Sequence, residues 1–117
     1  IAGNANSSDI YYTTPFTTLS AATNPLVAKF NEAYKAKFGE DAPTFAALAY
    51  DSVYMVKKAI ENEKSADSVK IQAGLAKLKN FKGVTGNTTM DAKHNPQKLI
   101  TIVKLENGKP VKGYVVK

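Results

Sequence analysis

The residues best suited to chemistry in this 117-residue chain are one histidine and a few carboxylates. His94, the single histidine, lies in a polar stretch beside Asn95 and Pro96, where we interpret it as a solvated turn residue rather than a ligand or a base. The chain has no cysteine, and a zinc site needs more thiolate or imidazole ligands than one histidine supplies. We therefore expect no metal site and no cofactor.

Two aspartates lie where a carboxylate needs a partner. Asp51 lies inside an apolar run, so we expect a backbone or hydroxyl group to hold it in a buried or half-buried position. Asp91 follows a β-like segment and is expected to cap a turn. No Ser-His-Asp set, phosphate loop or carboxylate pair is apparent, and the stretch from Gly83 to Gly86 is too short for a dinucleotide fingerprint. We predict no catalytic residues and no enzyme activity.

The charge of the chain separates two classes of partner. The net charge is +6, and all 16 basic residues are lysines scattered along every segment. Proteins that read nucleic acids rely on arginine for bidentate contacts with guanine and phosphate. We interpret the lysines as a solvated surface and predict no nucleic-acid partner. The first nine residues do not resemble a signal peptide, and we expect the chain to be a piece of a longer protein.

The element expected to organise the fold is a helix over residues 43–63. Its sequence is almost entirely apolar or small from Phe45 to Val56, apart from Asp51 and Ser52. Two rows have helical spacing, namely Phe45, Ala49, Val53, Val56 and Ile60, and beside them Ala46, Tyr50 and Tyr54. A helix that is apolar over so much of its circumference is normally covered on more than one side. We therefore predict that this helix packs on two flanks. Its apolar run is too short, and too interrupted by Asp51 and the lysines that follow, to span a membrane.

Two further helices have recognisable ends. Asn24-Pro25 provides an N-cap and a first helical residue, and Gly39 ends the same helix. Ser65 or Asp67 caps another helix that runs to about residue 79. Because the break before this helix is short, we expect it to pack with the central helix as an antiparallel or steeply crossed pair.

The rest of the chain is predicted to be strand and turn. Asn107-Gly108 favours a type I′ turn, which would pair a strand at 99–105 antiparallel with a strand at 110–116. The apolar run of the first of these strands predicts cover on both its faces. Earlier segments are expected to be a strand at 10–16, a polar connection at 17–23, a β-like segment at 81–90 and a turn-rich loop at 91–98.

Three blocks carry a family resemblance. They are NPLVAKFNEAYKAKFG at 24–39, PTFAALAYDSVY at 43–54, and FKGVTGNTTMD at 81–91 followed by a turn and residues 99–115. In this order and spacing they resemble the last third of the solute-binding receptors of bacterial branched-chain amino-acid ABC importers. The resemblance implies an α/β fold, a fragment of the type I periplasmic-binding-protein fold with three helices, a few strands and a C-terminal β-hairpin.

Receptors of this family have two α/β lobes that close around a ligand by a hinge. The resemblance implies that residues 1–117 are a single C-terminal fragment, with about 17–90 in the first lobe and about 91–117 as a hairpin of the second. It places Phe45 at the position whose ring lines the ligand's side-chain pocket, with plain core packing as the alternative. The implied ligand is a branched-chain or similar apolar amino acid, and the implied partner is an ABC permease.

The resemblance also implies an extracellular or periplasmic location, with a lipid tether in a Gram-positive source. The alternative function is an amino-acid-sensing module of a signalling receptor. The groups that hold the ligand's carboxylate and amine in the family have no match here, so this chain alone should bind an amino acid poorly. Its uncovered apolar helix faces and open strand edges predict self-association.

Overall fold

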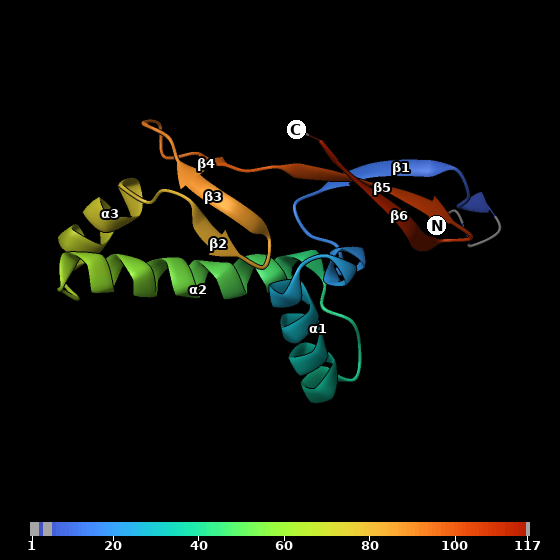
Figure 1. Ribbon diagram of the computed structural model, residues 1–117, viewed down its shortest axis with the longest axis horizontal. Helices are drawn as coiled ribbons and strands as arrows, with labels where there is room; N and C mark the ends of the chain where they lie inside the picture. The colour runs from blue at the N-terminus through green and yellow to red at the C-terminus, as the bar shows by residue number, and fades with distance from the viewer. Residues whose placement is uncertain (1–2, 4–5, 117) are drawn as a thin grey trace. The chain divides into compact units, whose positions relative to one another are not determined.

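The computed structural model describes residue 3 and residues 6–116 of the chain. The chain divides into two compact units (Figure 1). Unit 1 comprises Ile1–Thr44 and Leu99–Lys117, and unit 2 comprises Phe45–Lys98. Unit 2 is thus an insertion in unit 1, and the chain passes from one unit to the other after Thr44 and after Lys98.

Unit 1 is built on a three-stranded antiparallel sheet with β5 in the middle (Figure 1). Its elements, in chain order, are β1 (Ile10–Thr14), the 3-10 helix η2 (Thr18–Ala22), α1 (Pro25–Phe38), β5 (Ile100–Glu106) and β6 (Lys109–Val116). Val103 on β5 lies opposite Tyr12 on β1 and Gly113 on β6, and it is fully buried. The strand expected at 10–16 is present and ends two residues earlier, at Thr14.

The hairpin between β5 and β6 has the tight turn that the sequence predicts. Asn107 and Gly108 have φ angles of 50° and 74°, the positive values that both central positions of a type I′ turn require. The two strands pair antiparallel, with Glu106 opposite Lys109 next to the turn. The predicted pairing is confirmed.

Helix α1 has both end signals that the sequence predicts. The Asn24 side chain accepts a hydrogen bond of 3.0 Å from the main-chain N–H two residues later, and Gly39 follows the helix with a φ of 79°. On its buried face, Phe30 meets Phe16 edge to face with ring centroids 5.9 Å apart. These two rings and Val27 are buried and form part of the core of unit 1.

Unit 2 combines two helices with a small antiparallel sheet. Its elements, in chain order, are α2 (Thr44–Glu63, whose first residue belongs to unit 1), α3 (Ser68–Ala76), β2 (Phe81–Gly83), β3 (Gly86–Met90) and β4 (Pro96–Gln97). Gly74 of α3 approaches Ala59 of α2 so closely that a Cβ on the glycine would lie 3.0 Å from the alanine Cβ. The predicted contact between these two helices is confirmed. Glycine costs a helix about 1 kcal/mol relative to alanine, and here it permits the close approach.

Helix α3 is capped by Asp67, one of its two expected caps. The Asp67 carboxylate accepts hydrogen bonds from the main-chain N–H groups two and three residues later. The helix ends at Ala76 rather than near residue 79, because the chain turns there and buries Leu78. The Leu78 carbonyl then accepts a hydrogen bond of 2.9 Å from the Met90 N–H.

The buried face of α2 differs from the one that hydrophobicity predicts. Ala47, Asp51 and Ala59 are buried, and they belong to one row with a four-residue spacing. The expected row points elsewhere, since Phe45 is 84% exposed and Val53 is 68% exposed. The expectation that two flanks of α2 are covered is therefore wrong for the described chain. The β2–β3 hairpin meets the row of small side chains around Asp51.

Three shorter segments also differ from the sequence-based expectation. The connection at 17–23 contains η2, which starts where the Thr17 hydroxyl accepts a hydrogen bond from the Leu19 N–H. The loop at 91–98 contains β4, which pairs with β3. Cover on both faces of the strand at 99–105 is partial, because within β5 Val103 is buried and the other residues, on both faces, are half-buried.

Candidate functional site

Phe45 is the residue for which the sequence predicts a ligand contact. It lies in the first turn of α2, and 84% of its surface is exposed. Core packing within this chain, the alternative for Phe45, therefore does not hold. Contact with a ligand stays a prediction.

A hollow lies in unit 1 beside the start of α2. Its volume is about 320 Å³, near the lower end of the range for small-molecule sites. The wall combines aromatic and proline carbons with hydroxyls and one carboxylate, and its residues are Tyr12, Phe16, Thr17, Thr18, Asp41, Ala42, Pro43, Thr44 and Pro110. Thr44, the residue before Phe45 in the chain, is thus part of the wall.

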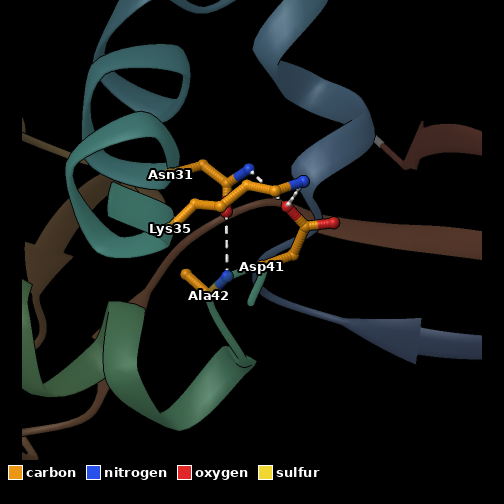
Figure 2. Close-up of polar contacts among 4 residues, drawn as sticks. All are labelled: Asn31, Lys35, Asp41 and Ala42. Carbon is orange, nitrogen blue, oxygen red and sulfur yellow. Dashed lines mark hydrogen bonds and ion pairs between the residues drawn. The ribbon is translucent and has the colours of Figure 1, made fainter. Parts of the chain in front are cut away.

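A polar clip fixes the loop that forms one side of this hollow (Figure 2). The Asn31 side chain donates to the Asp41 carboxylate at 3.1 Å and accepts from the Ala42 N–H at 2.8 Å. The Lys35 ammonium lies 3.4 Å from the same Asp41 oxygen. The hydrogen bond from Asn31, then the bond and charge of Lys35, hold the pKa of the Asp41 carboxyl below its ordinary value. The clip ties the end of the α1–α2 loop to α1.

A second contact joins the end of β1 to the first residue of α2. The buried Thr14 hydroxyl donates to the Phe16 carbonyl at 2.8 Å, and it lies 3.3 Å from the Thr44 hydroxyl. Together with the clip, this contact fixes the segment that leads into α2 from both sides. The main-chain path up to Phe45 is therefore well anchored within unit 1.

In unit 2, Asp51 is held as the sequence predicts. It is 2% exposed, and its carboxylate accepts three hydrogen bonds from the turn between β2 and β3. The donors are the Val84 N–H at 2.8 Å, the Thr85 N–H at 2.8 Å and the Thr85 hydroxyl at 2.6 Å. Gly83 makes this approach possible, because a Cβ there would lie 2.3 Å from the Asp51 Oδ2. The prediction of a buried carboxylate with backbone and hydroxyl partners is confirmed.

Lys98 extends this network at the last residue of unit 2. Its Nζ donates to the Thr85 hydroxyl oxygen at 2.6 Å, so the hydroxyl links the ammonium to the Asp51 carboxylate. Burial lowers the pKa of the Lys98 ammonium, and the negative charge of Asp51 opposes part of that shift. The result is an ion pair bridged by a hydroxyl group, which ties α2 to the hairpin and to the chain segment leaving the unit.

Asp91 and His94 have the structural roles that the sequence predicts. The Asp91 carboxylate accepts hydrogen bonds of 2.8 Å from the N–H groups of Lys93 and Asn95. The bond from Asn95 is the largest cause of a pKa below the ordinary value for Asp91. His94 is exposed in the same turn, with a φ of 63°. Across the residues that the structure describes, no group of three or more potential metal ligands occurs.

Sequence reasoning predicted a ligand contact for Phe45, which stays a prediction, and the need of Asp51 for partners, which is confirmed. It missed the surroundings of both residues. The clip joins Asn31 to a carboxylate 10 residues later, and the hydroxyl bridge joins Asp51 to a residue 34 positions later. No local pattern encodes pairs at these separations. Gly83 was a weak signal for the contact with Asp51, since an isolated glycine in a strand often marks the close approach of another group.

The chain is similar to known solute-binding proteins. A family model for periplasmic binding proteins matches residues 2–110, whereas no curated protein matches the chain. The chain is 40% identical to LivJ, the substrate-binding protein of a branched-chain amino acid transporter from Streptococcus pneumoniae, in a structure with isoleucine bound. That match has a TM-score of 0.86 and covers 98% of this chain and 32% of LivJ.

A second solved structure gives the same picture. The leucine-binding protein LivK from Thermotoga maritima is 31% identical, with a TM-score of 0.81. The match covers 95% of this chain and 31% of LivK. The chain thus spans less than a third of the length of each of these two relatives.

Proposed function

Because the chain belongs to the periplasmic binding protein family, as the match over residues 2–110 shows, we propose that it is part of a solute-binding protein that captures a branched-chain or similar apolar amino acid for an ABC importer. The observation that carries this proposal is the likeness to isoleucine-bound LivJ over 98% of the chain. The three helices and two small sheets agree with the α/β fragment predicted from the sequence. LivJ is the substrate-binding protein of a branched-chain amino acid transporter and LivK is a leucine-binding protein, and neither favours the sensing alternative. Solute-binding proteins are not enzymes, which supports the expectation that the chain catalyses no reaction.

The test of this function is ligand binding by the intact protein. Calorimetric titration with isoleucine, leucine and valine should give saturable binding, whereas aspartate and lysine should give none, because an apolar pocket cannot satisfy a second charged group. Equal binding of charged and apolar amino acids, or of neither, would contradict the proposal.

Phe45 is proposed as an aromatic wall of the ligand's side-chain pocket. Its ring is exposed on the first turn of α2, and the segment before it is anchored by Thr14 and by the Asn31 clip. In the intact receptor, Phe45→Ala should weaken binding of an apolar amino acid by about tenfold or more, since the ring supplies apolar contact. Phe38→Ala, which removes another exposed ring, is the matched control and should leave affinity unchanged. A large loss of stability with unchanged affinity would contradict a pocket role.

The lobe assignment belongs to the same proposal. In the intact receptor, residues from about 17 to 90 would build part of the first lobe and residues from about 91 to 117 a hairpin of the second. A crystal structure of the intact protein would test this assignment, and a hairpin packed within the first lobe would contradict it.

The family implies an extracellular or periplasmic location. No helix in the described part of the chain has the length and apolar character needed to cross a membrane. For a Gram-positive source we propose that a lipid tethers the intact protein to the membrane. Metabolic labelling with a fatty acid would detect that lipid, and release of unlabelled protein into the medium would contradict it.

Self-association of this 117-residue chain is also proposed. The support comes from exposed apolar side chains on α2, among them Val53, Tyr54 and Val56, and from the exposed edge strand β6. Apolar patches and open strand edges both recruit other copies. Light scattering over a dilution series should show a dimer or larger species that dissociates on dilution. A single monomeric species at high concentration would contradict this proposal.

A further inference from the structure

The turn between β5 and β6 is held by the segment Ser7–Ser8, near the other end of the chain, where Ser8 lies 99 residues before Asn107. The Gly108 N–H donates to the Ser7 carbonyl at 3.1 Å. The Asn107 N–H donates to the Ser8 hydroxyl oxygen at 2.9 Å, and that hydroxyl lies 3.3 Å from the Asn107 side-chain oxygen. We call these three contacts the latch. They involve the Gly108 main-chain N–H and the Asn107 side-chain amide, the two groups of the turn that can react with each other.

An asparagine followed by glycine is prone to lose its side-chain amide. The glycine main-chain nitrogen loses its proton to solvent base and attacks the asparagine Cγ, a C–N bond forms, and ammonia leaves. Water then opens the resulting succinimide at either carbonyl and yields aspartate or isoaspartate. Glycine favours this reaction because it has no side chain to obstruct the ring closure, and asparagine is a known thermolabile residue.

We propose that Asn107-Gly108 is a deamidation site that the latch keeps closed. For the reaction, the Gly108 nitrogen must give up its proton and approach the Asn107 Cγ. In the structure the Gly108 N–H donates a hydrogen bond to the Ser7 carbonyl, and the Asn107 side-chain oxygen accepts one from the Ser8 hydroxyl. The reaction therefore proceeds from the fraction of molecules in which the latch is open, although the turn itself is exposed to solvent.

The product would alter the end of the hairpin. Lys104 already forms ion pairs with two carboxylates, with its Nζ 3.0 Å from Asp9 and 2.6 Å from Glu106. Deamidation adds a third negative charge at position 107, beside Glu106, and in the isoaspartate form it also lengthens the main chain. Like charges repel, so the new carboxylate would destabilise the end of the hairpin beside Glu106. In the isoaspartate form the extra main-chain atom would also displace the N–H groups that make the latch, and the change could not reverse spontaneously.

The experiment compares deamidation rates in mildly alkaline buffer by peptide mass mapping. Cation-exchange chromatography detects the accompanying decrease in net positive charge. The samples are the 117-residue chain, the same chain unfolded in urea, the variant Ser8→Ala, and Ser52→Ala as the matched control. Ser52 makes its side-chain hydrogen bond to the Leu48 carbonyl on α2, away from the latch. Hydrogen exchange at the Gly108 amide reports latch opening independently, and circular dichroism verifies that each variant is folded.

The folded chain should deamidate at position 107 much more slowly than the unfolded chain. Ser8→Ala should raise the rate about tenfold, equivalent to about 1.4 kcal/mol of lost latch stability, and should raise exchange at Gly108 in parallel. Ser52→Ala should match the unsubstituted chain. Equal rates in the folded and unfolded chain would overturn the protection, an unchanged rate in Ser8→Ala would overturn the role of the latch, and no deamidation in urea would overturn the site itself.

Discussion

Replacing Thr85 by valine should loosen the attachment of α2 to the β2–β3 hairpin. Its hydroxyl donates to Asp51 at 2.6 Å and accepts from Lys98 at 2.6 Å, and both Thr85 and Asp51 are 2% exposed. Valine has nearly the shape of threonine, so the change removes the hydroxyl without opening a large cavity. A hydrogen bond to a charged group contributes about 1.5–3 kcal/mol. In the valine variant the half-buried Lys98 ammonium can bond to water in place of the lost hydroxyl, so this second contact adds little to the cost. We expect the free energy of unfolding of unit 2 to fall by about 2 kcal/mol.

Two measurements check this prediction. Urea unfolding reports the loss of stability, and hydrogen exchange at the Val84 and Thr85 amides, which donate to Asp51, reports opening of the contact. A loss of about 2 kcal/mol should make exchange at these amides about thirtyfold faster. Thr85→Ser is the matched control, since it keeps the hydroxyl and loses one methyl group worth about 1 kcal/mol. If the valine and serine variants unfold at the same urea concentration with equal exchange, the hydroxyl bridge does not hold the hairpin.

Three further substitutions test other contacts. Asn31→Ala should raise the pKa of Asp41 toward its ordinary value, because the Asn31 hydrogen bond is the largest cause of the lowered value, and an NMR titration would measure it. The folded pKa of Asp41 lies below the unfolded pKa, so this carboxylate stabilises the fold above the unfolded pKa, and that contribution is lost as the pH falls through the folded pKa. The variant, which lacks much of this contribution, should lose less stability on acidification. Gly83→Ala should cost about 2–3 kcal/mol in urea unfolding, because its Cβ would lie 2.3 Å from the Asp51 Oδ2. Gly108→Val should cost about 1–2 kcal/mol, because φ is 74° there, and an unchanged thermal midpoint would contradict this reasoning.

The parts of the fold that the sequence predicts are those that local chemistry determines. Asn24 and Gly39 mark the ends of α1, because a side-chain acceptor and a left-handed residue each satisfy main-chain groups within a few positions. The hairpin at Asn107-Gly108 follows from two residues that tolerate positive φ. The need of Asp51 for partners follows from its apolar neighbours alone. In each case the deciding groups lie within one or two turns of chain.

The parts that the sequence does not predict depend on which segments meet. The partners of Asp51 lie 33 and 34 residues away, in a turn that gives no signal of its own for a carboxylate. The Asn31 amide could equally have faced solvent, and only the path of the α1–α2 loop brings Asp41 within 3.1 Å of it. The length of η2 and the short strand β4 likewise depend on neighbours rather than on propensity.

The two faces of α2 illustrate a limit of hydrophobicity as a guide to burial. Large apolar side chains indicate that a helix can be covered, whereas small ones decide how near another main chain can come. The hairpin needs the near approach, because Gly83 and the turn after it must reach the Asp51 carboxylate, so it packs on the row that contains Ala47. The larger side chains, Phe45 and Val53, are left exposed and available to a partner. If a ligand contacts Phe45 and another copy of the chain contacts Val53, substitutions at the two residues should have different effects. Phe45→Ala should weaken ligand binding by the intact protein, whereas Val53→Ser should weaken only the self-association of the 117-residue chain.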